Sequence, residues 1–125
     1  MILLLDAHAL LWWFADDPDL ADSARRSIND PANDIVVSAG TVWEIEVKRR
    51  LGRLEAPAGI LTALESSGIS TLPITAVDAE YAAALPLHHR DPFDRMLIAQ
   101  AARIDATIVT RDRAFALYDA LILPA

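Results

Sequence analysis

The sequence has no cysteine among its 125 residues. Disulfide bonds, thiolate metal sites and cysteine nucleophiles are therefore excluded from its chemistry. No apolar run approaches the roughly 18 residues that a membrane-spanning helix requires. The apolar start, MILLLDAHALLWWF, has no basic segment before it, and Asp6 interrupts it. We therefore expect folded structure here rather than a signal peptide. The absence of cysteine favours a cytoplasmic protein, with a cysteine-free secreted protein as the open alternative.

Positive charge is also scarce. Ten arginines and one lysine stand against 18 aspartates and glutamates, which gives a net charge of −7. This balance argues against a nucleic-acid partner. If four acids belong to a metal site, however, the remaining balance is 11 − 14 = −3, a much weaker objection. Arginine is the better bidentate partner for phosphate, although a GC-rich genome would produce the same excess of arginine.

The rest of the composition is that of a globular domain, with 54% hydrophobic and 23% charged residues. Five short apolar runs are typical of strands, at residues 2–5, 35–38, 69–74, 107–110 and 120–124. Helical patterns lie between them, at residues 7–15, 20–30, 41–51, 57–68, 76–85, from Pro92 onward, and at 112–118. This alternation predicts one compact α/β domain over residues 1–125, with a mainly parallel sheet covered by helices on both faces.

Two acids follow predicted strands. Asp6 comes directly after the first strand, and Asp112 follows the 107–110 strand by two residues. In open parallel sheets, ligands bind beyond the carboxyl ends of the strands, so both acids are placed for chemistry. An aspartate after a strand is also often only the N-cap of the next helix. Position alone leaves both interpretations open.

The helix predicted at 41–51 contains a third candidate, Glu44. Trp43, Val47 and Leu51 recur every four residues and form an apolar stripe, and Glu44 falls at what we expect to be its buried edge. The alternative role is an i,i+4 ion pair with Lys48. Glu46 and Arg50 repeat that spacing, so a purely structural explanation stays open. A buried acid nevertheless needs a partner once it has lost water.

The segment HHRDPFDRMLIAQA, residues 88–101, places two acids at the start of a helix. Asp91 before Pro92 is a standard beginning, with the aspartate as N-cap and the proline as first helical residue. Asp94 suits the helix dipole. It also shares a face with the apolar residues Leu97 and Ile98, where an unpaired carboxylate is costly. Capping therefore explains Asp91 fully and Asp94 only in part.

Taken together, these stretches resemble the PIN-domain ribonucleases, most closely the VapC-like toxins of type II toxin–antitoxin pairs. The matching segments are LLLDAHALLWW, SAGTVWEIEVKRRLGRL, LPLHHRDPFDRMLIAQA and TIVTRDRAFALY, which span nearly the whole chain in the family's order. The resemblance implies an acid cluster that binds Mg²⁺ or Mn²⁺. Its members here are Asp6, Glu44, Asp94 and, as the more variable fourth acid, Asp112. A Thr or Ser often follows the first aspartate in that family, whereas this chain has Ala7.

The implied chemistry is physically reasonable. Carboxylates near ~4 Å repel each other by about 4 kcal/mol per pair at an effective dielectric of 20, so such a cluster needs a cation. Oxygen ligands, without cysteine and as expected without histidine, select hard ions such as Mg²⁺ or Mn²⁺. These ions activate a water for in-line attack and stabilise the departing oxygen. The expected reaction is endonucleolytic hydrolysis of single-stranded or looped RNA.

Residues around these acids have less certain roles. His8 could touch the site but is more typical of a structural histidine, and the loop residues His88, His89 and Arg90 form a candidate substrate rim. Arg95 and Arg111 could bind phosphate or balance charge.

Trp12 and Trp13 are expected in the core or a subunit interface. The apolar early helix and the resemblance imply a homodimer, and the resemblance also implies a cognate antitoxin that covers the site.

Other families fit less well. Haloacid dehalogenase-type phosphatases need a second aspartate two residues after the first, where this chain has His8, and the serine-hydrolase motif G-x-S-x-G is absent. Receiver domains need an acidic pair near the first strand and an aspartate at the end of the third strand. The IVVS strand of this chain ends at Ser38 instead, so the fit is poor. The alternative that stays open is a catalytically inactive PIN-like module that binds RNA or protein. The presence of all four acids argues against it.

Overall fold

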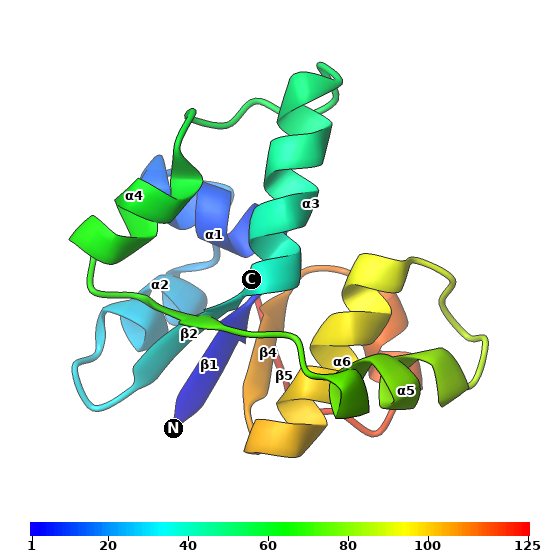
Figure 1. The fold of residues 1–125 in the computed structure, drawn as a ribbon. Helices are drawn as coiled ribbons and strands as arrows, with labels where there is room; N and C mark the ends of the chain where they lie inside the picture. The colour runs from blue at the N-terminus through cyan, green and yellow to red at the C-terminus, as the bar shows by residue number, and fades with distance from the viewer.

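The structure, a computed structural model, describes all residues from 1 to 125 (Figure 1). Its strands are β1 (Ile2–Leu5), β2 (Asp34–Ser38), β3 (Ser70–Leu72), β4 (Thr107–Thr110) and β5 (Ile122–Pro124). Its α-helices are α1 (Ala7–Phe14), α2 (Asp22–Asn29), α3 (Ala39–Arg50), α4 (Ile60–Ser66), α5 (Ala76–Ala84) and α6 (Pro92–Ile104), and Arg113–Leu117 forms the 3-10 helix η1. None of these helices is both long and apolar enough to cross a membrane.

The five strands form a single sheet in the order β3-β2-β1-β4-β5. Every neighbouring pair is parallel, so the predicted mainly parallel sheet is confirmed. β1 lies at the centre, between β2 and β4. All carboxyl ends therefore meet at one edge of the sheet, and the segments that follow β1, β2 and β4 begin there. This edge is where ligands bind in open α/β sheets.

Alternate side chains of β1 enter two separate cores. Leu3 and Leu5 pack with residues of α1, α2, α3 and α4 on one face, whereas Leu4 packs with α6 and η1 on the other. This is why the run ILLL is apolar at every position, since a central parallel strand is buried on both sides. Figure 1 shows α1, α2 and α4 on one side of the sheet and α5 and α6 on the other.

Several element boundaries differ from the prediction. The helix expected from residue 57 begins at Ile60, because Gly59 adopts a left-handed conformation (φ 74°) that an α-helix cannot include. The helix expected at 112–118 is a short 3-10 helix rather than an α-helix. The third strand covers only Ser70–Leu72, as is common for a strand at a sheet edge.

The predicted burial of the apolar stripe on α3 was wrong. Trp43 and Leu51 are 63% and 61% exposed, and Val47 is also exposed. The helix instead buries the face that contains Glu44 and Ile45. Helical spacing identified a stripe correctly, but it could not show which face of the helix meets the sheet. Glu44 is thus buried for a different reason from the one inferred.

Candidate metal centre

An open cavity of about 510 Å³ lies at the carboxyl-end edge of the sheet. Its lining residues are mostly charged or polar: Asp6, Ala7, His8, Trp12, Glu44, Lys48, Asp91, Asp94, Arg111 and Asp112. All four acids proposed from the sequence are among them, and they come from four separate segments of the chain. The fold therefore brings the predicted residues to one place.

Asp6 enters the cavity from the end of β1. Its side chain caps α1 by accepting a hydrogen bond from the backbone amide of Ala9 at 2.9 Å. The residue is only 8% exposed. Burial raises the pKa of Asp6, while a hydrogen bond from the Thr110 side chain acts in the opposite direction. Capping and a place in the acid cavity, which were alternatives in the sequence, are both present.

Thr110 interacts with both Asp6 and Asp112, and this role was not predicted from the sequence. It is the last residue of β4 and is 1% exposed. Its hydroxyl oxygen also accepts a hydrogen bond from the backbone amide of Asp112 at 3.0 Å. Asp112 in turn caps η1 through the amide of Ala114 at 2.9 Å, and its side chain is 44% exposed. The available signal was a threonine at the carboxyl end of a strand, two residues before a candidate acid.

Glu44 is buried on α3 and bonded to a cation. The Lys48 ammonium donates to its carboxylate at 2.6 Å, so the i,i+4 ion pair is confirmed within the cavity itself. The hydrogen bond to Glu44 raises the pKa of Lys48. The second expected pair differs, because Glu46 contacts Arg49 at 3.0 Å rather than Arg50.

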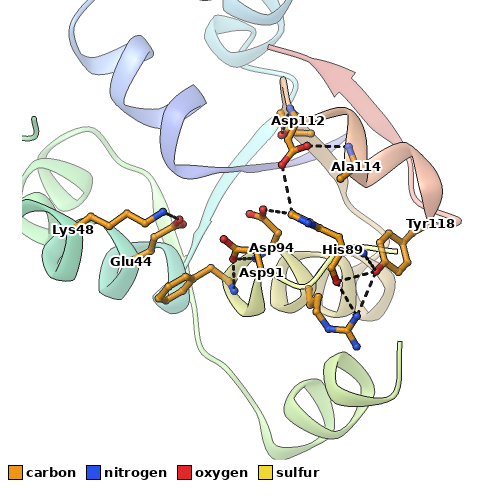
Figure 2. A network of polar contacts seen from close by, with 11 residues as sticks. Glu44, Lys48, His89, Asp91, Asp94, Asp112, Ala114 and Tyr118 are labelled. Carbon is orange, nitrogen blue, oxygen red and sulfur yellow. Dashed lines mark hydrogen bonds and ion pairs between the residues drawn. The ribbon is translucent and has the colours of Figure 1, made fainter. Parts of the chain in front are cut away.

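Asp91 and Asp94 lie in different environments at the start of α6. Asp91 accepts hydrogen bonds from the amides of Phe93 at 2.8 Å and Asp94 at 3.1 Å, which confirms it as the N-cap of α6. The Asp94 side chain is 17% exposed and points into the cavity (Figure 2). Desolvation by burial raises the pKa of Asp94 to about 6, against a smaller lowering by a hydrogen bond to His89.

A histidine lies beside the predicted acids, although the sequence led us to expect metal ligands without histidine. His89 Nε2 lies 2.6 Å from Asp94 Oδ2 and 3.5 Å from Asp112 Oδ2 (Figure 2). One potential ligand atom from each of these three residues lies within 4.8 Å of the others. Asp6 and Glu44 line the same cavity outside this tight group. The sequence placed His89 in a rim loop because spacing alone could not show how that loop folds back.

Arg95 holds this loop in place. It is 7% exposed, and its guanidinium donates hydrogen bonds to backbone carbonyls inside the protein. The acceptors are Ala82 at 2.8 Å, Ala83 at 3.2 Å, Leu85 at 2.8 Å, Pro86 at 2.9 Å and His89 at 3.1 Å. The hypothesis that Arg95 binds phosphate is therefore wrong, because its donors are used within the fold.

Tyr118 fixes the same loop from the other side. Its hydroxyl donates to the carbonyl of Pro86 at 2.6 Å and accepts from the backbone amide of His89 at 2.9 Å. The ring of His88 packs edge-on against Tyr118 at 5.3 Å and does not line the acid cavity. Arg90 is exposed and also lies outside the cavity lining.

Three further side chains form the rim of the cavity. His8 is exposed rather than enclosed as a structural histidine, and its ring centroid lies 5.7 Å from that of Trp12. The Arg111 guanidinium lies over the same Trp12 ring, 4.3 Å from its centroid, and donates hydrogen bonds to the backbone carbonyls of Ala125 and Asp19. Trp13 is half-buried and packs against the core, as expected.

The donor set fits a divalent cation. Five carboxylates and only two cations, Lys48 and Arg111, line the cavity. Burial raises the pKa of both Asp6 and Asp94, because desolvation disfavours the charged form of a carboxylate. A bound cation of charge +2 would supply the missing compensation. Oxygen-rich sites of this kind suit Mg²⁺ or Mn²⁺.

Comparison with known proteins agrees with this geometry. The sequence profile of the PIN domain matches residues 3–121. The chain belongs to the PIN domain family. A curated relative of this PIN domain protein is Ribonuclease VapC22 of Mycobacterium tuberculosis, which is 31% identical over 114 residues, covering 89% of this chain and 87% of the relative.

Solved structures share the same fold. One is VapBC2 from Rickettsia felis bound to a promoter DNA fragment, with a TM-score of 0.71, 18% identity, and coverage of 99% of this chain and 98% of the other. Another is a toxin–antitoxin complex from Klebsiella pneumoniae, with a TM-score of 0.67, 20% identity, and coverage of 98% and 96%. At these identities the similarity establishes the fold.

Proposed function

We propose that this PIN domain is a Mg²⁺- or Mn²⁺-dependent endoribonuclease that acts as the toxin of a toxin–antitoxin system. The observation that supports it most directly is the convergence of Asp6, Glu44, Asp94 and Asp112 on one open cavity. The ribonuclease name of its 31% identical relative supports the reaction class. Metal, substrate and biological role are all part of the proposal.

The four acids would hold the metal, which when bound supplies an activated water and stabilises the oxygen that leaves the phosphorus. Asp6 is oriented by its cap of α1, and Asp112 is oriented by its cap of η1 and by the hydrogen bond from its amide to Thr110. Lys48 and Arg111 place positive charge at the cavity, where an RNA phosphate would enter. Together with a bound divalent cation, these two positive side chains would reduce the repulsion between the acidic cavity and an RNA phosphate.

The proposed partner is a cognate antitoxin. One solved structure with the same fold is a toxin–antitoxin complex from Klebsiella pneumoniae. The cavity is acidic and open, so it suits a basic antitoxin side chain placed among the carboxylates. Expression of the chain alone should arrest bacterial growth, whereas its Asp6→Asn variant should be tolerated. Equal toxicity of the two forms would contradict the nuclease proposal.

A homodimer is the proposed assembly. The half-buried aromatic residues of α1 pack against the chain's own core, so they offer little free apolar surface. The stripe of Trp43, Val47 and Leu51 on α3 is exposed and is our candidate for contact with a second copy. Light scattering should give twice the monomer mass for the parent and the monomer mass for Leu51→Glu.

The competing proposal is a PIN-like module without activity. Calorimetric titration with Mg²⁺ separates the two, because an inactive module should show no binding that depends on the acids. The direct test is cleavage of single-stranded RNA by purified protein in Mg²⁺ or Mn²⁺, in EDTA, and by Asp6→Asn purified identically. We expect cleavage only by the parent with metal. Undiminished cleavage in EDTA, with the variant equally active, would exclude a metal-dependent mechanism.

A further inference from the structure

We propose that His89 is a direct ligand in the metal centre, so that the site is a mixed nitrogen and oxygen site rather than an all-carboxylate one. This inference rests on the proposed function and adds a residue and an ion preference to it. The Nε2 atom of His89 lies beside two of the proposed acidic ligands, Asp94 and Asp112.

The distances suit a shared ion. Ligand atoms in adjacent positions of an octahedral site lie ~3 Å apart when metal–ligand bonds are about 2.1 Å long. His89 Nε2 lies 2.6 Å from Asp94 Oδ2 and 3.5 Å from Asp112 Oδ2, on either side of that separation. Small side-chain rotations would bring all three atoms onto one cation. In the metal-free protein, the same nitrogen hydrogen bonds to Asp94.

The backbone of His89 is unusually constrained for a loop residue. Its amide donates to the Tyr118 hydroxyl at 2.9 Å, and its carbonyl accepts from the Arg95 guanidinium at 3.1 Å. Arg95 and Tyr118 are both buried. On the ring itself, Phe115 packs edge-on at 6.2 Å. These contacts hold the imidazole toward the acids before any metal binds, which reduces the entropy lost on coordination.

A neighbouring residue shows that this placement is specific. His88 precedes His89 directly, yet its ring packs on Tyr118 and lies outside the acid cavity. The chain thus offers a matched control histidine one position away. Of the two histidines, His89 has a ring nitrogen near the carboxylates. Its side chain is 21% exposed, which leaves it accessible to an entering ion.

The proposal has a consequence for ion preference. Imidazole is a softer ligand than carboxylate and binds transition ions better than Mg²⁺. The binding preference for Mn²⁺ over Mg²⁺ should therefore depend on His89. Its ligating nitrogen must be free of a proton when the metal is bound, which leaves the remaining ring proton on Nδ1.

The experiment measures Mn²⁺ coordination directly. Protein loaded with one equivalent of Mn²⁺ is examined by electron spin echo envelope modulation, which detects a nitrogen bonded to the ion. We expect ¹⁴N modulation in the parent and in His88→Gln, and its loss in His89→Gln. Glutamine can still hydrogen bond to Asp94, so a role limited to that hydrogen bond would be retained in this variant.

Calorimetry supplies the second measurement. Mn²⁺ affinity should fall by about 10-fold or more in His89→Gln, with a smaller fall for Mg²⁺, while His88→Gln matches the parent. Circular dichroism and thermal unfolding verify that each variant is folded.

Two results would overturn the inference. If Mn²⁺ binds in a manner that Asp94→Asn weakens, but without ¹⁴N modulation from His89, the metal site stands and the ligand assignment is wrong. If the parent binds no Mn²⁺ at all, both the ligand assignment and the metal-dependent function fail.

Discussion

The Asp91 carboxylate accepts a hydrogen bond from the backbone amide of Asp94, at 3.1 Å. One acid thereby caps helix α6 and fixes the backbone of the other, whose side chain points into the cavity and contacts His89. A capping aspartate can be replaced by asparagine with little loss, because both side chains offer the same oxygen acceptor. An aspartate that binds a metal ion cannot be replaced by asparagine in this way, because its negative charge is needed to bind the cation. The two acids should therefore respond differently to the same substitution.

We predict that Asp94→Asn lowers RNA cleavage by orders of magnitude while the fold stays intact. The same change should raise the melting temperature of the metal-free protein, because it removes a desolvated charge. Added Mg²⁺ should stabilise the variant less than the parent, since ligand stabilisation follows affinity. Cleavage assays and thermal unfolding with and without Mg²⁺ measure all three effects.

The matched control is Asp91→Asn, which should retain most activity and the parent's response to Mg²⁺. Its stability should change by at most about 1 kcal/mol, because the cap is preserved. An inactive Asp91→Asn beside an active Asp94→Asn would mean that the two roles have been assigned the wrong way round.

The second prediction concerns pH. The pKa of Asp94 is about 6 in the folded protein, compared with an ordinary value of 3.8. Between these values the folded protein binds a proton that the unfolded chain does not. The metal-free protein should therefore gain stability as pH falls from about 7 to about 4, and lose it as pH rises through about 6. The difference corresponds to at most about 3 kcal/mol.

The test compares denaturant unfolding of the parent and Asp94→Asn across this pH range in EDTA. The variant should lack the part of the pH dependence that Asp94 contributes. Groups remote from Asp94 act in both proteins alike, for example Asp78, whose pKa is lowered by its hydrogen bond to Arg103. Parallel pH profiles for the two proteins would contradict the prediction. Saturating Mg²⁺ should also flatten the parent's profile, because it favours the ionised carboxylate.

The third prediction addresses the pair of Glu44 and Lys48. Lys48→Met leaves a carboxylate that is 6% exposed without its cation, which should destabilise the metal-free protein by about 1–3 kcal/mol. Glu44→Gln in the same chain should restore much of this loss, giving a clear coupling energy in a double-mutant cycle. Added Mg²⁺ should stabilise Lys48→Met more than the parent. Additive effects of the two substitutions would show that the pair is not coupled.

The sequence alone predicted the architecture well, for identifiable reasons. The fully apolar run ILLL indicated a strand covered on both faces, and Leu3 and Leu4 indeed enter different cores. Asp6 and Asp112 could be placed at the same edge of the sheet, because carboxyl ends of parallel strands meet there. The Asp91–Pro92 signal gave the start of α6 correctly. Each of these inferences depends on local pattern and strand direction.

What could not be predicted depends on how distant segments pack. The stripe of Trp43 and Leu51 has correct helical spacing, but its exposure follows from the rotation of α3 against the sheet. His89 comes near Asp112 only because the loop at residues 85–91 folds back over the edge of the sheet. No periodicity in the sequence contains that information. Hydrogen bonds from Arg95 and Tyr118 hold the loop in this position.

The last prediction therefore concerns Arg95, for which phosphate binding and a structural role were both open in the sequence. Arg95→Met should destabilise the protein by about 3 kcal/mol or more, because several buried carbonyls, among them those of Leu85 and His89, lose a charged donor. Arg95→Lys should be intermediate, since an ammonium cannot reach all of these acceptors. Denaturant unfolding and hydrogen exchange of the loop amides measure the effect. A phosphate-binding arginine would behave in the opposite way, with weaker RNA binding and an unchanged unfolding midpoint. That result would show that the carbonyl contacts of Arg95 do not hold the loop, and it would also remove the structural support for His89 at the metal centre.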